Sequence, residues 1–146
     1  MKKGGWGDLS RSNTDFLVAR LLSNGRPDPL FGQEGYQFVD FKNGVDAAHA
    51  LALDPTGRIV VAGDGRIGGA GPTGTGYWPA GFIALTRLLP DGRLDQRFGR
   101  KGKAIMSFEN HGRGEVTTMT LLGVNKILVG GSAGNRGTIS WFPAPY

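Results

Sequence analysis

Short apolar runs, each bounded by Gly, Pro, Asn or Asp, recur along the whole chain and predict β-strands. In the run Phe16–Leu22, alternate residues fall on two faces that are both largely apolar, so we expect a strand covered on both sides. No capped segment of helical length shows a 3.6-residue period. The expected strands are residues 16–22, 36–41, 49–54, 58–63, 82–89, 103–108, 117–122 and 126–131.

The runs belong to a repeat. "RLLSNGR" from Arg20 comes back as "RLLPDGR" from Arg87, an offset of 67 residues (87 − 20). "ALALDPTGRIVVAG" from Ala50 aligns with "TMTLLGVNKILVGG" from Thr118 at an offset of 68 (118 − 50). A fixed period of this size indicates a copied supersecondary unit. The units are about 15–63 and 81–131, with a partial third at 137–142 in a single repeat domain covering 1–146.

Each unit reads as four strands, in the chain order three, four, one, two. A repeated four-stranded sheet that is covered on both faces is the blade of a β-propeller. The expected fold class is therefore all-β, with about two four-stranded antiparallel blades per chain. Phe16 and Gly25 are nine steps apart whereas Phe82 and Gly92 are ten apart, which indicates a bulge or a shifted strand start near Phe82.

The motif "DFLVARLLSNGRPDPLFGQEG … ALALDPTGRIVVAG" resembles the bacterial delta-60 repeat family, and the resemblance extends from about Asp15 to Gly131. The resemblance implies a propeller-like fold, often in secreted or surface-associated bacterial proteins, with no catalytic residues to carry over. The second copy departs from the family at "LLGVNK", where a Pro-Asp-Gly turn is usual, which affects the geometry of that turn.

The repeated turns are expected to be structural rather than phosphate-binding. Gly25 and Gly92 supply the positive φ that a turn requires. Downstream, matched residues shape the bend: Asp28 and Asp95 as acceptors of main-chain N–H groups, Phe31 and Phe98 between neighbouring blades, and Gly32 and Gly99 where the chain turns back.

Two blades cannot close a ring, because propellers have roughly four to eight blades. We therefore expect homo-oligomeric closure, in which Phe16–Phe41 pairs with Thr117–Gly131 of a neighbouring chain, head to tail. Three chains would give six blades and four would give eight. The other possibility is that the sequence is a segment of a longer repeat protein. The strand at 137–142 is redundant with 16–22, so one of the two would lie outside the sheet.

Composition agrees with one globular domain: 146 residues, 39% hydrophobic and 20% charged, with 26 glycines for the many turns. The net charge of +5 is spread through turns without a basic helix or arginine run, so we expect no nucleic-acid partner. No apolar run is long enough for a membrane span. The start is not a signal peptide as it stands, and the lack of cysteine leaves the compartment open.

The longest irregular stretch, Gly63–Gly81, is the candidate ligand-binding loop. Tyr77 and Trp78, with Trp6 in the counterpart loop, could form aromatic platforms for a sugar. The alternative is that Trp78 packs on a neighbouring blade. The full set of candidate ligand-binding residues is Trp6, Asp64, Arg66, Tyr77 and Trp78.

No motif for catalysis or cofactor binding stands out. His49 and His111 belong to no metal-spaced cluster, and no spacing singles out a pair of acid–base carboxylates. The glycine-rich "GDGRIGGAG" lacks a Walker lysine, and the acidic pattern of a calcium loop is missing. We expect no enzyme, cofactor or metal site. The leading hypothesis is a self-assembling propeller module whose rim loops bind a carbohydrate or protein. The main alternative is a structural repeat segment of a larger extracellular bacterial protein, with no ligand of its own, and an enzyme with a site in the central channel is a weaker one.

Overall fold

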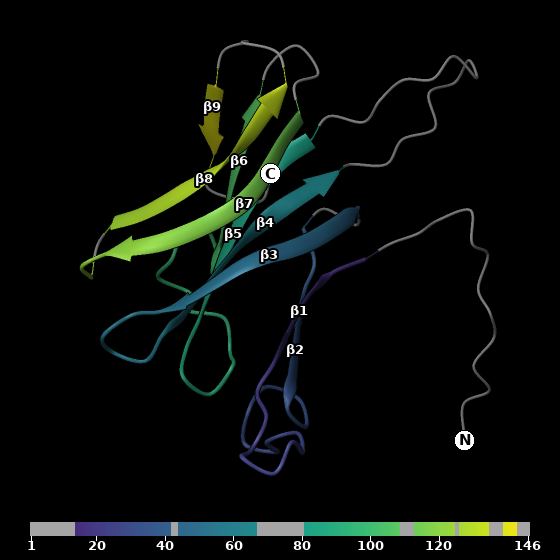
Figure 1. The fold of residues 1–146 in the computed structure, drawn as a ribbon, viewed down its shortest axis with the longest axis vertical. Helices are drawn as coiled ribbons and strands as arrows, with labels where there is room; N and C mark the ends of the chain where they lie inside the picture. The colour runs from purple at the N-terminus through teal and green to yellow at the C-terminus, as the bar shows by residue number, and fades with distance from the viewer. Residues whose placement is uncertain are drawn as a thin grey trace, which may run out of the picture.

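The protein is all-β. A computed structural model describes residues 14–41, 44–66, 81–108, 113–124, 126–134 and 139–142, and all the regular secondary structure in these ranges is strand (Figure 1). The strands are β1 Phe16–Ala19, β2 Tyr36–Val39, β3 Val45–Leu53, β4 Ile59–Arg66, β5 Gly81–Leu88, β6 Lys103–Phe108, β7 Arg113–Leu122, β8 Lys126–Gly134 and β9 Ile139–Phe142. The described ranges hold no helix that is long and apolar enough to cross a membrane.

One complete antiparallel blade occupies the middle of the chain, in the order β3-β4-β5-β6. A fifth strand, β9, extends it beyond β6. The remaining strands form two-stranded sheets: the N-terminal hairpin, β1–β2, and the C-terminal hairpin, β7–β8. Strands three and four of one unit thus precede the complete blade, and strands one and two of the next unit follow it, as the repeat predicts.

The three sheets are stacked, with the complete blade in the middle. One face of the blade packs on the N-terminal hairpin, where the ring centre of Phe41, next to β2, lies 6.5 Å from that of Phe82 in β5. The opposite face is covered by the C-terminal hairpin, because β7 contacts β3, β4 and β5. The buried apolar cluster comprises Phe16, Val18, Phe31, Val39, Phe41, Ile59, Val61, Phe82, Ala84, Leu88 and Ile105.

Both repeats contain the same irregularity. The pairing register shifts between Ala48 and Ala50 in β3, and at the equivalent position between Val116 and Thr118 in β7. A glycine faces each bulge. A Cβ at Gly63 would overlap the main-chain oxygen of Ala47, and Gly131 is confined in the same way by Glu115. The repeat is therefore conserved between the two copies down to a main-chain detail that only glycine permits.

The structure corrects the predicted coverage and ends of two strands. β1 stops at Ala19 rather than Leu22, because Leu22 opens a turn in which its N–H donates to Arg26. Phe16 and Val18 are buried while Leu17 is exposed, so this strand is covered on one side only in the single chain. β5 pairs with both neighbours without irregularity, so the feature near Phe82 is a shifted strand start and not a bulge.

The strand Ile139–Phe142 pairs with β6 and not with β8. This places it at the outer edge of the complete blade. Its predicted role as strand three of a further unit would have put it beside β8. In the part of the chain that the structure describes, the outer edge of β8 is left unpaired.

Candidate functional sites at the two rims

The strand ends define two rims of the stacked sheets. At the first, here called the loop rim, lie the starts of β1, β3, β5 and β7 and the ends of β2, β4, β6 and β8. The candidate ligand-binding loops are attached at the loop rim. The other rim, here called the turn rim, carries the repeated turns at 20–35 and 89–102 and the hairpin turns at 54–58 and 122–126.

Of the five candidate ligand-binding residues, Asp64 and Arg66 lie in described parts of the chain. Trp6, Tyr77 and Trp78 lie outside the described residues. Asp64 and Arg66 were expected in the irregular stretch after Gly63, but β4 continues through Arg66 and pairs with both β3 and β5. The physical reason is that Gly63 and Gly65 leave room for the rings of Phe16 and Phe82, so the strand can extend against them.

Asp64 is buried and contacts a histidine. His49 Nε2 lies 2.6 Å from Asp64 Oδ1. Within the described part of the chain this oxygen has no hydrogen-bond partner. The contact is an ion pair only when His49 is protonated. His49 is held there by the bulge in β3, at the position that interrupts the register. Neither residue's neighbours along the sequence signal this pair, since 15 residues separate them (64 − 49).

Arg66 links two sheets. Its Nη2 lies 4.0 Å from Glu115 Oε1 on β7, across the boundary between the complete blade and the C-terminal hairpin. Both side chains are substantially exposed, so this ion pair contributes little to stability. The described part of the candidate ligand site is thus one paired carboxylate and one paired guanidinium at the loop rim.

Three carboxylates form a separate cluster at the loop rim. One oxygen from each of Asp15, Asp40 and Asp46 lies within 4.8 Å of the others. Burial raises the pKa of Asp46 to about 6, and the nearby Asp40 and Asp15 charges add to the rise. A hydrogen bond from the Phe41 N–H and the charge of Lys103 act in the opposite direction. These are the described residues with the geometry to hold a metal ion.

The turn rim repeats one polar arrangement. Arg20 Nε donates to Asp28 at 2.8 Å, and Arg87 Nε donates to Asp95 at 2.8 Å. Each aspartate also accepts a main-chain N–H two residues downstream, at 2.9 Å and 3.1 Å, as predicted for the bend. The guanidinium carbons lie 4.9 Å and 5.0 Å from the ring centres of Phe31 and Phe98, within the range of a cation–π contact.

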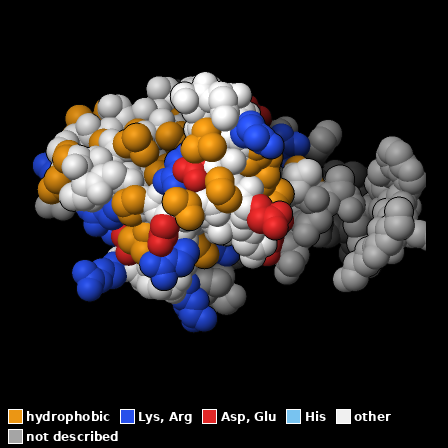
Figure 2. Space-filling view, turned by 90° about the horizontal axis from the view of Figure 1, so that it is seen from below, with side chains coloured by type: hydrophobic (Ala, Val, Ile, Leu, Met, Phe, Trp, Pro, Cys, Tyr) orange, Lys and Arg blue, Asp and Glu red, His pale blue; other side chains and the backbone are white. Residues whose placement is uncertain are grey.

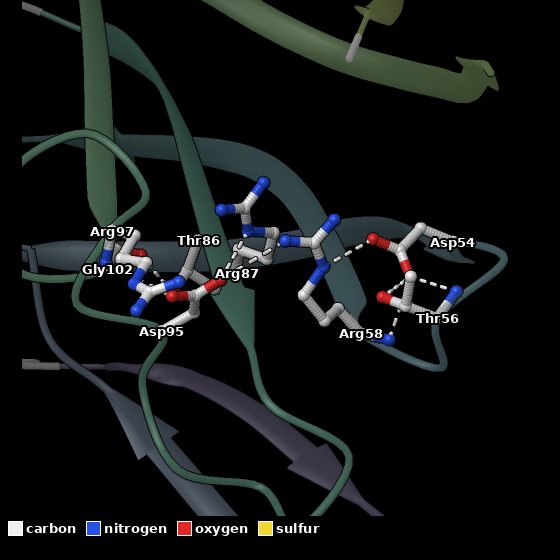
Figure 3. A network of polar contacts seen from close by, with 8 residues as sticks. All are labelled: Asp54, Thr56, Arg58, Thr86, Arg87, Asp95, Arg97 and Gly102. Atoms are coloured by element: carbon white, nitrogen blue, oxygen red, sulfur yellow. Dashed lines mark hydrogen bonds and ion pairs between the residues drawn. The ribbon is translucent and has the colours of Figure 1, made fainter. Parts of the chain in front are cut away.

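Figure 3 shows how this arrangement continues into the hairpin turn. Arg58 lies between two carboxylates, with Nε 2.6 Å from Asp54 and Nη1 3.9 Å from Asp95. Burial of Asp54 opposes its ionisation, but hydrogen bonds from Thr56 and Arg58 outweigh it and hold the pKa of Asp54 well below its usual range. The buried Thr86 hydroxyl donates to the Gly102 oxygen at 2.9 Å. These groups bind one another, which is a structural role.

The described residues form a cavity and a groove on the turn rim. A cavity of about 180 Å³ separates Val60 and Phe98 from Leu121 and Ile127 of the C-terminal hairpin. An open groove of about 830 Å³ is lined by Arg58, Arg93 and Arg97 among others. Figure 2, seen from below, shows basic and acidic side chains interspersed with apolar ones rather than one basic patch.

Comparison with protein families gives a match near the start of the chain. Residues 4–31 match a family described as "Domain of unknown function (DUF5122) beta-propeller". The matched stretch includes β1 and the first repeated turn, up to the buried Phe31. No curated protein and no solved structure matches the chain. The match covers a small part of the chain, and it agrees with the blade-like sheets.

Proposed function

We propose that this chain is a non-enzymatic β-propeller module of delta-60-type repeats, which assembles head to tail into a ring and presents its loop rim to a ligand. In this assembly the C-terminal hairpin of one chain and the N-terminal hairpin of the next form one composite blade. The propeller-like match over residues 4–31 and the repeated, blade-like sheets support the module. The surface of the two hairpins supports the assembly.

The observation that carries the proposal is that residues exposed on the hairpins are repeat equivalents of core residues. Leu17 and Phe38 are 50% and 59% exposed, while their equivalents in the complete blade, Ala84 and Ile105, are 0% and 3% exposed. At the other end, Leu128 is 56% exposed and its equivalent Val60 is 2% exposed. The same positions are buried wherever a neighbouring blade is present, so the exposed ones mark absent neighbours.

The free edges of β1 and β8 also match the strand pairing seen in the complete blade. In the complete blade, strand two pairs with strand three, with Val61 opposite Thr86. The repeat offsets convert this pair into Val129 on β8 and Ala19 on β1 of the next chain. Each of these strands pairs with one neighbour in the described part of the chain. Antiparallel pairing between chains would satisfy both edges.

Packing in the composite blade would follow the contacts already present. Val60 faces Leu121 and Ile127 across the turn-rim cavity. By repeat equivalence, Leu128 would face Leu53 and Ile59 of the next chain. Leu53 is 64% exposed in the single chain and would be covered by this contact. Three chains would close a six-bladed ring and four an eight-bladed ring.

A cysteine pair tests the assembly directly, because the natural sequence has no cysteine. Chains carrying both Ala19→Cys and Val129→Cys should oxidise to covalent trimers or tetramers, resolved by non-reducing electrophoresis and light scattering. The matched control, Ala19→Cys with Leu128→Cys, places the thiols on opposite faces and should crosslink poorly. Equal crosslinking in both variants, or a monomer by light scattering at micromolar concentration, would contradict the assembly.

The ligand is proposed to bind at the loop rim, where the loops differ in length and sequence between repeats. In this proposal Tyr77, Trp78 and Trp6, which lie outside the described residues, contribute aromatic rings, and Asp64 and Arg66 lie at the end of β4 from which the loop starts. Binding on a glycan array that disappears with Trp78→Ala supports a carbohydrate ligand. A stable ring that binds no glycan and no protein partner would support the alternative of a structural repeat without a ligand of its own.

The weaker alternative is an enzyme with a site in the central channel. The observation in its favour is the pair of His49 and Asp64, which joins the first and second strands of the complete blade. A positioned histidine can act as a general acid or base. Hydrolase activity lost with His49→Ala, but kept with Thr117→Ala at the equivalent position, would favour this alternative.

A further inference from the structure

Three aspartates from three separate elements meet at the loop rim. Asp15 immediately precedes β1, Asp40 immediately follows β2, and Asp46 is the second residue of β3. One carboxylate oxygen of each lies within 4.8 Å of the others. No linear motif joins them, because they converge only when the N-terminal hairpin packs on the complete blade.

Asp46 is the buried member of the cluster, at 2% exposure. Its Oδ2 accepts the main-chain N–H of Phe41 at 2.7 Å. Among the residues that the structure describes, its Oδ1 is buried without a hydrogen-bond partner, and so is Oδ1 of Asp15. Buried polar atoms are almost always satisfied in folded proteins, so two carboxylate oxygens in one cluster call for a group that the described residues do not supply.

The nearby positive charge does not serve that purpose. Lys103 Nζ donates to the main-chain oxygen of Asp40 at 2.5 Å and lies 5.6 Å from the centre of the Phe41 ring. Its charge lowers the pKa of Asp46, but burial and the two neighbouring carboxylates prevail. Lys103 therefore binds a main-chain oxygen of the cluster, and the pKa of Asp46 stays raised in a partly dehydrated site.

Packing of the repeat does not account for the cluster either. At the same offsets of 67 and 68, the positions of Asp15, Asp40 and Asp46 correspond to Phe82, Ser107 and Gly114. None of these carries a carboxylate. The Arg–Asp pairs of the turn rim, by contrast, occur in both repeats. Residues that the packing of a blade requires are present in both repeats, whereas the three aspartates are present in one.

We propose that Asp15, Asp40 and Asp46 bind a divalent cation of the Ca²⁺ type. Ca²⁺ takes six to eight oxygen ligands in irregular geometry, including main-chain oxygens and waters, which suits three carboxylates that come from loop and strand ends. Asp40 is half-buried, so water can complete the coordination from one side. The ion joins the end of β2 to the start of β3 and thereby fixes the N-terminal hairpin on the complete blade. The site lies within one chain and is independent of the proposed assembly.

Calorimetric titration of the EDTA-treated, desalted full chain with CaCl₂, alongside its thermal unfolding midpoint, tests the site. We expect one ion per chain and a midpoint that rises with Ca²⁺ concentration. Asp46→Asn should weaken binding by at least about tenfold and remove the rise, because one charged ligand is lost. Asp40→Asn should act in the same direction and serves if Asp46→Asn does not fold.

The control is Asp91→Asn, an exposed carboxylate on the turn rim, which should bind Ca²⁺ like the natural chain. No heat and no change in the midpoint up to millimolar CaCl₂ would overturn the proposal. Binding that is unchanged in both cluster variants would also overturn it, since the ion would then lie elsewhere. A chain that stays monomeric but binds Ca²⁺ through these residues would refute the ring and retain the site.

Discussion

Arg20 donates a hydrogen bond from Nη1 to the main-chain oxygen of Pro90 at 2.6 Å, which ties the turn after β1 to the equivalent turn after β5. The Gly32 N–H donates to the Asp91 oxygen at 2.8 Å beside it. The two copies of the repeated turn therefore bind each other directly. The turn sequence recurs because each copy has to fit both its own blade and the copy in the neighbouring blade.

Gly92→Ala should be markedly more destabilising than Gly57→Ala. Both glycines have a positive φ, which costs an alanine about 1–2 kcal/mol. At Gly92 a Cβ would also lie 2.7 Å from the Gly32 nitrogen, whereas at Gly57 it meets only Pro90 at 3.5 Å. Crowding should add about 1–3 kcal/mol at Gly92. Urea unfolding of both variants measures the difference, and equal losses would contradict the docking of the two turns.

Phe38→Ala and Ile105→Ala should separate folding from assembly. Ile105 is in the core, so its truncation should cost about 2–5 kcal/mol of unfolding free energy. Phe38, at the equivalent position, is exposed in the single chain, and its truncation should cost about 1 kcal/mol or less. In light scattering, however, Phe38→Ala should shift the protein toward the monomer. A Phe38→Ala variant that assembles normally would argue against the proposed ring.

Gly25→Ala tests the same proposed interface between chains, at the turn-rim end of the N-terminal hairpin. In the single chain nothing lies within 4 Å of a Cβ at Gly25, whereas its equivalent Gly92 is confined by Gly32 and Phe31. In a ring, Gly25 would meet Gly99 and Phe98 of the neighbouring chain. The variant should therefore unfold like Gly57→Ala at monomeric concentrations but assemble more weakly. Analytical ultracentrifugation over a concentration series measures both.

Asp54→Asn should make the free energy of unfolding less dependent on pH in the acidic range. The pKa of Asp54 is lowered in the folded state by Thr56 and Arg58 despite burial, so the unfolded state binds more protons as the pH falls. The stabilisation is present above about pH 4–5 and is lost as the pH falls through the lowered pKa. Asp54→Asn should thus be less stable than the natural chain at pH 7, and the difference in unfolding free energy should narrow progressively as the pH falls below about 4.

Thr56→Val provides the graded case, because it removes one donor to Asp54 and leaves Arg58 in place. Its loss of stability at neutral pH should be smaller than that of Asp54→Asn. Chemical unfolding at a series of pH values measures all three proteins. A gap between the natural chain and Asp54→Asn that stays constant from pH 7 to pH 3 would show that the aspartate charge is not what stabilises the turn.

Local sequence was enough to predict the strands and the turns of the blade. The pattern around Gly25 and Gly92, and the aspartates that follow, is decided by φ preferences and by hydrogen bonds within about ten residues. The extension of β4 through Asp64 was missed because its cause, the space that Gly63 and Gly65 leave for two aromatic rings, lies in other strands.

The sites at the loop rim depend on contacts between elements, which a repeat alignment does not contain. His49 meets Asp64 only because β3 bulges at that point and pairs with β4. The three carboxylates converge only where the N-terminal hairpin packs on the complete blade. The position of β9 was also unpredictable, since an apolar strand of four residues can pair with either β6 or β8, and the sequence of the strand itself does not choose between them.

The strand β9 makes the two kinds of blade unequal. The blade inside each chain ends in a fifth strand, whereas a blade shared between chains would end at β2, with its outer side bare. A closed ring would therefore have the rotational symmetry of its chains rather than of its blades: threefold with six blades, or fourfold with eight. The unpaired edges of the β2 strands, spaced evenly around the circumference, would be the places where one ring could associate with another by strand pairing.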